Sequence, residues 1–390
     1  MSVLLLVLGL VLVIGLIVVH EVGHFIVARR NGVEIEEFGI FFPPKLYSRT
    51  TKAGWIFSIN TIPLGGFVKL KGEHDSDTES GTLGASSLFV KSKILLAGVS
   101  MNLVTGLVLF TLLAIIGMPQ LVQNQYIVKS NTKILSQKVL ISEVVTGSQA
   151  DKAGLRHGDV LTSIGLPNDK YQTLITDSSK LPNITKKFAG KNVVVHYIRT
   201  GMQHTVNVHL LSQQEVTVSQ NSKNPKYELG VAPQQLNINR STWSSPLVAI
   251  GLSTQLIGAT IQGLGHSIAG LGSLIAGAVT HNNVARQNGQ TAASANVTGP
   301  VGIFAILRTS SAMGYQVVLF FVAYISIILA FMNILPIPIV DGGKLYITLI
   351  MRALKRPLTA KREDAINLVS VIVLLCLFVL ITIADVKRFY

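Results

Sequence analysis

The pentapeptide His20-Glu21-Val22-Gly23-His24 constrains this chain most, because it ends an uncharged apolar run that begins at Val3. On a helix, His-Glu-x-x-His places two imidazoles on one face, where both reach one Zn²⁺ and the glutamate lies beside the metal as a general base. At a rise of roughly 1.5 Å per residue, Val3 to His20 covers about 25 Å of a hydrocarbon core about 30 Å thick. The motif therefore predicts metal-assisted hydrolysis inside a bilayer, near the end marked by Arg29 and Arg30.

An N-terminal apolar run is also typical of a signal peptide, which is the alternative interpretation. A signal peptide has a basic start and a small-residue cleavage site. Here no basic residue precedes Arg29, and no Ala-x-Ala pattern follows the run. Because ionisable residues within a membrane are costly and usually functional, we expect a transmembrane helix that carries an active site.

The composition is that of a membrane protein. The 390 residues have a mean hydropathy of +0.50 and only 13% are charged. In a soluble protein the net charge of +14 would suggest binding to nucleic acid. In this chain we expect the basic residues to lie in loops that fix the membrane topology and contact anionic lipid, and we expect no nucleic-acid partner. A single cysteine, Cys376, excludes an internal disulfide and a cysteine-based zinc site.

Four segments are long and apolar enough to span a membrane: residues 3–28, 94–118, 315–335 and 365–384. The positive-inside rule places the loops 29–93 and 352–362 in the cytoplasm, so both termini are expected outside. The uncharged stretch 247–279 is ambiguous. We expect interfacial or re-entrant helices there, because an additional crossing would separate the polar end of the third span from His20.

The long insert between the second and third spans predicts an aqueous α+β domain. Residues 139–165 have the pattern of a strand, a polar helix, a tight glycine turn and a second strand. Residues 193–195 and 206–211 add two β-type runs. Upstream, residues 55–61 and 67–71 predict two short strands joined by 62–66, a hairpin whose edge could pair with an extended peptide; the alternative is a structural loop.

Asp341 is the candidate third ligand for the metal. A catalytic zinc usually takes three protein ligands and a water. The third span carries its polar groups at the same end as the first, and Pro336 and Pro338 break its helix before the pair Gly342-Gly343 permits a tight turn. Asp341 could then fold back to the metal; the alternative is an ordinary turn aspartate at the surface.

Taken together, these residues resemble the site-2 protease family of intramembrane zinc metalloproteases, of the bacterial type with one PDZ domain. The resemblance rests on residues 20–24, on the motif 333–343 and on residues 153–161, which are similar to a PDZ domain of bacterial proteases. The resemblance implies one Zn²⁺ per chain, held by His20, His24 and Asp341, with Glu21 as catalytic base. It further implies substrate contacts from the following residues: Asn333, Gly65, Gly66, Phe67, Val68, Pro336 and Pro338.

The resemblance also implies the substrates and the setting. These are transmembrane segments of single-span proteins, of the anti-sigma-factor or remnant-signal-peptide type, trimmed beforehand by another protease. A carboxyl-terminal peptide would bind in the PDZ groove. The enzyme would be an integral protein of the bacterial inner membrane, with its active site near the cytoplasmic side. A catalytically inactive relative and a zinc transporter are the alternatives; a transporter would need acidic or histidine residues in the second and fourth spans, which have none.

The expected fold class is a polytopic α-helical membrane protein with about four transmembrane helices, a membrane-associated β-hairpin and an inserted extracytoplasmic α+β PDZ domain. The expected domains are an N-terminal membrane half (1–118, with the hairpin at about 55–73), a PDZ-like domain (119–240, with its core at about 130–213), an interfacial or re-entrant segment (241–312) and a C-terminal membrane half (313–390).

Overall fold

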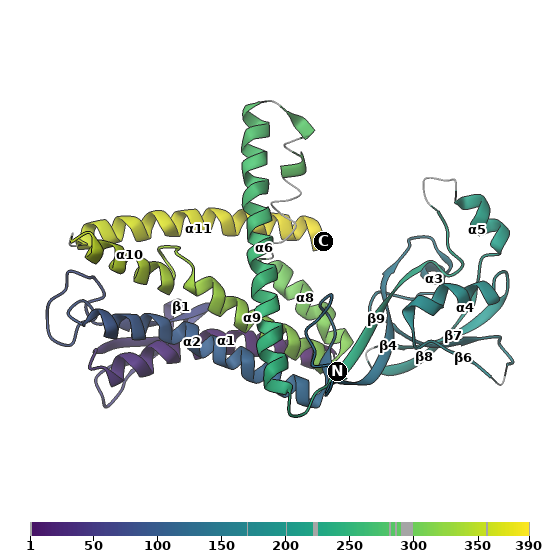
Figure 1. The fold of residues 1–390 in the computed structure, drawn as a ribbon, viewed down its shortest axis with the longest axis horizontal. Helices are drawn as coiled ribbons and strands as arrows, with labels where there is room; N and C mark the ends of the chain where they lie inside the picture. Colours follow the sequence, from purple (N-terminus) through teal and green to yellow (C-terminus); the bar gives the residue numbers. More distant parts are fainter. Residues whose placement is uncertain are drawn as a thin grey trace. The chain divides into compact units, whose positions relative to one another are not determined.

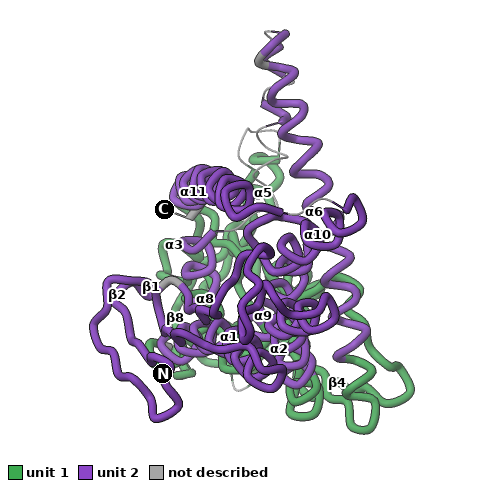
Figure 2. The backbone as a smooth tube through the Cα atoms, turned by 90° about the vertical axis from the view of Figure 1, so that its left-hand side faces the viewer, with its two compact units in different colours: residues 1–6, 111–248, 308–320 green, residues 7–110, 249–307, 321–390 purple. Residues whose placement is uncertain are grey.

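The computed structural model describes residues 2–169, 171–199, 201–220, 225–280, 282–284, 287–289, 299–355 and 358–389. The chain divides into two compact units, which Figure 2 shows in different colours. The first unit is built mainly from residues 111–248. The second is built from residues 7–110, 249–307 and 321–390, and it contains both sequence motifs that predict the metal site.

Helices form most of the second unit (Figure 1). The helices outside the insert are α1 (Ser2–Arg30), α2 (Leu88–Ile116), α6 (Ser245–Val279), α8 (Pro300–Met313), α9 (Tyr315–Ile334), α10 (Asp341–Ala353) and α11 (Ala360–Phe389). Within the described residues, five of these are long and apolar enough to cross a membrane: α1, α2, α6, α9 and α11. Each of the four predicted spans corresponds to one of them, and α6 is a fifth candidate.

Helix α6 is continuous over its 35 residues, so no turn back interrupts the stretch for which we expected interfacial or re-entrant helices. Its assignment to the membrane interface stays a prediction. Its length and composition are also those of a crossing helix.

Small residues let α2 pack closely against α1 on one side and α9 on the other. A Cβ atom added to Gly23 would lie 2.7 Å from the carbonyl oxygen of Ala97, and one added to Gly106 would lie 2.6 Å from Cδ1 of Ile327. Helices in lipid associate through such close backbone contacts, because lipid offers no hydrophobic drive toward association. This packing determines which face of α2 is directed toward the histidines of α1.

Strands β1 (Ile35–Thr50) and β2 (Ile56–Leu70) form a separate sheet that is interrupted by register shifts. Gly39 is paired with both Phe67 and Ser58, so residues 35–40 lie between the two halves of β2. The prediction that residues 62–66 form the turn of a hairpin is wrong. The turn comes earlier, at 51–55, and residues 62–66 are an irregular stretch inside β2, where Gly65 has a φ of 128°.

Polar contacts attach the loop after β2 to α10 and α11. Lys344 of α10 lies 3.5 Å from Glu73, and the ring of His74 contacts Asp364 of α11 at 3.1 Å. At the other end of α11, the Asp385 carboxylate accepts hydrogen bonds from the backbone N–H groups of Gly299 and Gly302, at the start of α8. The side chain of Asp385 thereby satisfies donors that a helix N-terminus leaves free.

The first unit contains a seven-stranded sheet with the order β3-β9-β4-β5-β7-β8, and β6 pairs with β5. Its strands are β3 (Met118–Pro119), β4 (Lys133–Val144), β5 (Val160–Gly165), β6 (Thr173–Leu174), β7 (Asn192–Arg199), β8 (Met202–His209) and β9 (Val231–Arg240). Its short helices are α3 (Gln149–Lys152), η1 (Ser178–Lys180), α4 (Leu181–Lys187) and α5 (Gln213–Ser219).

The predicted strand-helix-turn-strand pattern of residues 139–165 is confirmed by β4, α3 and β5, with Gly154 and Gly158 at positive φ between them. The run 193–195 lies within β7, and the run 206–211 begins in β8 and extends two residues past its end at His209. Alternate apolar side chains of these strands form a buried core with Leu155 and Leu229. The domain is therefore α+β, as expected; its PDZ character stays a prediction.

An ion pair links the buried Asp159, which directly precedes β5, to the partly exposed Arg199 at the end of β7. The Asp159 side chain is 1% exposed and receives two hydrogen bonds of 2.7 Å from the Arg199 guanidinium. We expect Arg199→Leu to destabilise this unit by about 3–5 kcal/mol, because the buried carboxylate would lose its partner. Hydrogen exchange of β4, β5 and β7 in the full-length protein measures the loss.

The matched control is Arg156→Leu, because Arg156 is exposed and its hydrogen bonds with Asp159 are made by its backbone N–H and carbonyl groups. The protection of β4, β5 and β7 from hydrogen exchange should be the same in this variant as in the wild type. Equal protection in the two variants would contradict a stabilising role for the ion pair.

Candidate active site

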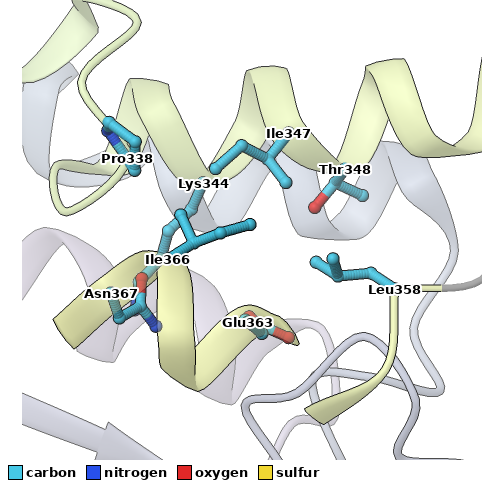
Figure 3. Close-up of a pocket in the computed structure, with 8 residues that line it drawn as sticks. All are labelled: Pro338, Lys344, Ile347, Thr348, Leu358, Glu363, Ile366 and Asn367. Atoms are coloured by element: carbon cyan, nitrogen blue, oxygen red, sulfur yellow. The ribbon is translucent and has the colours of Figure 1, made fainter. Parts of the chain in front are cut away.

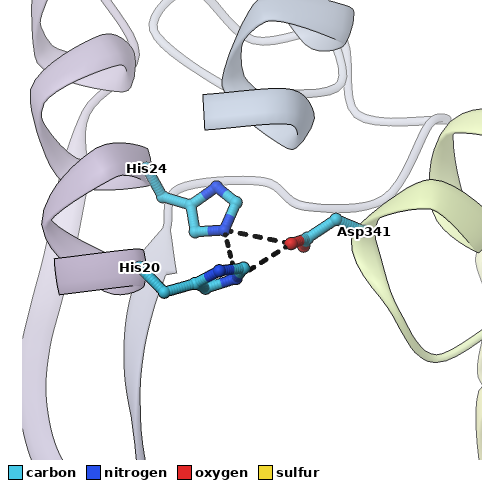
Figure 4. A group of neighbouring side chains, drawn as sticks. All are labelled: His20, His24 and Asp341. Carbon is cyan, nitrogen blue, oxygen red and sulfur yellow. Dashed lines mark hydrogen bonds and ion pairs between the residues drawn. The ribbon is translucent and has the colours of Figure 1, made fainter. Parts of the chain in front are cut away.

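One turn of α1 presents His20 and His24 to the interior of the second unit. The two side chains are about 10% exposed and their Nε2 atoms are 3.1 Å apart. Residues four apart share a face of a helix, which explains why both rings point the same way. The Nε2 atoms also face Asp341 Oδ2, at 3.0 Å from His20 and 3.2 Å from His24 (Figure 4).

Asp341 reaches this position because the chain turns back after α9. The break at 335–340 contains both prolines, and Asp341 begins α10. The predicted role of the glycine pair needs correction. Neither glycine has a positive φ; both lie in the first turn of α10, where a Cβ at Gly342 would come within 2.5 Å of the Ile334 carbonyl oxygen and one at Gly343 would collide with that of Ile337. The pair permits close packing rather than a turn.

Glu21 lies between the histidine cluster and β2. A Cβ added to Gly66 would be 3.4 Å from Cγ of Glu21, and the Glu21 carboxylate lies beside the backbone of Val68. The residues predicted as metal ligands, base and hairpin therefore come together in one place.

The other residues predicted to bind substrate have varied surroundings. The ring of Phe67 covers Gly39, and a Cβ at Gly65 would come within 2.7 Å of the Phe42 ring. Val68 packs against the buried cluster that includes Leu70 and Ile94. Asn333 donates a hydrogen bond of 3.0 Å to the Leu329 carbonyl of its own helix, and Pro336 is exposed.

A small pocket between α10 and α11 contains the remaining predicted residue, Pro338 (Figure 3). Its lining residues are Pro338, Lys344, Ile347, Thr348, Leu358, Glu363, Ile366 and Asn367. None of them is a histidine or aspartate of the cluster, so this pocket is distinct from the site of chemistry.

Helix α2 supplies a part of the site that the sequence analysis missed. A Cβ added to Gly98 would lie 2.5 Å from His24 Nε2 and 2.6 Å from His20 Nε2. One turn before it, the carbonyl oxygen of Ile94 is 2.8 Å from His24 Nδ1; one turn after it, Asn102 is 3.3 Å from His20 Nδ1. The sequence signal for this part of the site was a glycine and an asparagine four residues apart in an apolar span.

This arrangement fits a zinc ion. The donor set is two imidazole nitrogens and one carboxylate oxygen, and all three atoms lie within 4.8 Å of one another. That is the ligand chemistry of a catalytic zinc, which keeps a further position for water. The space that Gly98 leaves beside both Nε2 atoms is consistent with an ion at this place.

Comparison with known proteins gives the same chemistry. A sequence model of peptidase family M50 matches residues 8–377. A Clostridium perfringens protein named "Putative zinc metalloprotease" is 29% identical over 380 residues, which is 95% of each chain. A Clostridium acetobutylicum protein of the same description is 25% identical, over 95% of this chain and 94% of its own length. The "Probable protease eep" of Enterococcus faecalis is 23% identical, over 97% of this chain and 98% of its own length.

Gly98→Ala tests whether the space beside the histidines holds the metal. The added methyl group would come within 2.6 Å of both Nε2 atoms and force the rings to shift, so we expect the purified variant to lose its zinc. Elemental analysis of protein purified from membranes measures the zinc content.

Gly15→Ala is the matched control, because a Cβ at this position of α1 would meet no atom of the described residues within 4 Å. It should retain one zinc per chain. A Gly98→Ala variant with full zinc content would place the metal elsewhere.

Proposed function

Because this chain belongs to peptidase family M50, the site-2 proteases, and is a zinc metallopeptidase of the membrane, we propose that it cleaves transmembrane segments of single-span membrane proteins. One observation carries the proposal. His20, Glu21 and His24 lie on a membrane-length apolar helix, and Asp341 meets the two histidines there although 317 residues separate it from His24.

The proposed ligands are His20, His24 and Asp341, through the three atoms that face one another. When bound, zinc supplies a Lewis acid that polarises the scissile carbonyl and lowers the pKa of water. The low exposure of the two histidines keeps bulk water away from their nitrogens, which strengthens every electrostatic contact at this place.

Glu21 is the proposed general base. Its carboxylate oxygen takes a proton from the attacking water and then delivers it to the leaving amide nitrogen. The position of the carboxylate beside the Val68 backbone would orient it for these transfers. Both proton transfers therefore take place beside the strand that we propose for substrate binding.

Residues 66–70 of β2 are the proposed docking strand for substrate. Among the described residues they pair on one side only, with β1, and so form an edge of the sheet. An extended peptide can add to such an edge through backbone hydrogen bonds. A transmembrane helix hides its carbonyls in internal hydrogen bonds and must unwind before cleavage, and strand addition would stabilise the unwound form. Asn333, Pro336 and Pro338 are proposed to help hold it.

The remaining proposals concern topology and substrate. Basic loops favour a cytoplasmic position for residues 29–93, which places both termini and the insert outside in a four-span arrangement. The active site would then lie within the bacterial inner membrane near the cytoplasm. The insert would act as a PDZ-like domain that binds a carboxyl-terminal peptide or excludes large ectodomains, and the substrates would be anti-sigma factors or remnant signal peptides.

Glu21→Gln tests the mechanism. Loss of a general base should lower the rate of cleavage by about 10²–10⁴-fold, while zinc content stays at that of the wild type. Cleavage of a tagged, single-span substrate with a short ectodomain, in membranes, is the measurement. Equal cleavage by wild type and variant would contradict the role of Glu21.

A second substrate with the same transmembrane segment but a folded ectodomain tests prior trimming. We expect cleavage of the short form and little of the long one, because the inserted domain would exclude the folded ectodomain. Equal cleavage of both forms would contradict exclusion by that domain.

A further inference from the structure

Three residues of α2 at intervals of four, Ile94, Gly98 and Asn102, face the two histidines of α1. Gly98 leaves space beside the Nε2 atoms, while Ile94 and Asn102 meet the Nδ1 atoms on the far sides of the rings. The two helices are paired so that Ile94 meets His24 and Asn102 meets His20. Through these contacts, Ile94 and Asn102 influence which nitrogen of each imidazole ring carries the proton.

The contact with Ile94 fixes the tautomer of His24. A carbonyl oxygen can only accept, so His24 must carry its proton on Nδ1 and donate it across the 2.8 Å contact. Its Nε2 atom then has a free lone pair directed toward Asp341. This is the form in which an imidazole binds a metal.

Asn102 occupies the corresponding position at His20. The residue is 1% exposed, its Nδ2 atom is 3.3 Å from His20 Nδ1, and its buried Oδ1 atom has no hydrogen-bond partner among the residues that the structure describes. The oxygen and nitrogen of an asparagine amide exchange places by a half-turn, and their assignment follows from the hydrogen bonds they make. With the oxygen toward His20, the amide accepts the Nδ1 proton and leaves Nε2 free.

A buried contact from α9 holds this turn of α2 in place. The hydroxyl of Ser326, which is fully buried, donates a hydrogen bond of 2.7 Å to the backbone carbonyl of Asn102. Gly106, one turn further along α2, lies against Ile327. Asn102 is thus presented to His20 from a backbone fixed on two sides.

We propose that Asn102 is a positioning residue that accepts the Nδ1 proton of His20 and so sets His20 Nε2 as a metal ligand. The inference rests on the proposed ligand set of His20, His24 and Asp341. It assigns the two rings the same tautomer, one set by a backbone carbonyl and the other by a side-chain carbonyl of the same helix.

The test is the affinity of the full-length, detergent-solubilised apoprotein for Zn²⁺, measured by competition with a chelating dye. Asn102→Leu removes the acceptor while keeping the branching and the number of heavy atoms of the side chain, and we expect zinc to bind about 10–100-fold more weakly, the usual effect of losing such a partner. Asn102→Asp keeps an acceptor oxygen and should bind zinc at least as tightly as the wild type. The zinc-induced rise in unfolding temperature, with each apoprotein as its own reference, should follow the same order.

Wild-type affinity in Asn102→Leu would overturn the proposal. Weak binding by both variants would overturn it as well, because Asn102 would then act through its N–H₂ group. Ser100→Ala is the control on the same helix: Ser100 is exposed and its hydroxyl donates a hydrogen bond to the Leu96 carbonyl of its own helix, so zinc affinity should not change.

His20→Ala separates this inference from the proposed ligand set. If zinc binds His20→Ala as tightly as the wild type, the ligand set itself is wrong. If His20→Ala loses zinc while Asn102→Leu keeps it, only the role of Asn102 fails.

Discussion

The contact between the Asp341 carboxylate and the two imidazoles of α1 is the interaction on which the structure of the second unit depends. An ionisable group within hydrocarbon costs several kcal/mol unless a partner compensates it. His20 and His24 find that partner on a helix that begins after the chain has left α9 and turned back. The break at 335–340 and the glycines at the start of α10 allow this carboxylate to reach the histidines.

Close packing of α1 on α2 is part of the same construction. Gly23 lies between the two histidines of the motif, and it is also the residue that allows the α2 backbone to approach. One turn of α1 therefore serves both chemistry and helix association. The approach brings Gly98 beside the Nε2 atoms and places Ile94 and Asn102 behind the rings, so α2 shapes the site without contributing a proposed ligand.

The sheet of β1 and β2 shows where local sequence signals fail. Residues 62–66 contain a proline and two glycines, and by composition they are typical of a turn. In the fold they are an irregularity within one long strand, because residues 35–40 pair with β2 on both sides of it. Such pairing joins residues distant in sequence, and β-structure depends on this context more than on propensity. The outcome matters for function, since it makes residues 66–70 an edge next to Glu21.

The sequence alone determined the chemistry and the membrane setting of this protein. The spacing of His20 and His24, the apolar run before them and the polar break after α9 are local patterns, and local patterns fix helices, their breaks and the residue types at a site. The strand-helix-turn-strand pattern and the two β-type runs in the insert likewise predicted β4, β5, β7 and β8. Only the tertiary structure decided which atoms meet: Asp341 with the two Nε2 atoms, Gly66 with Glu21, and Asn102 with His20. Those contacts depend on helix rotation and close backbone approach, which no single stretch of sequence specifies, because each is set by packing between segments far apart in the chain.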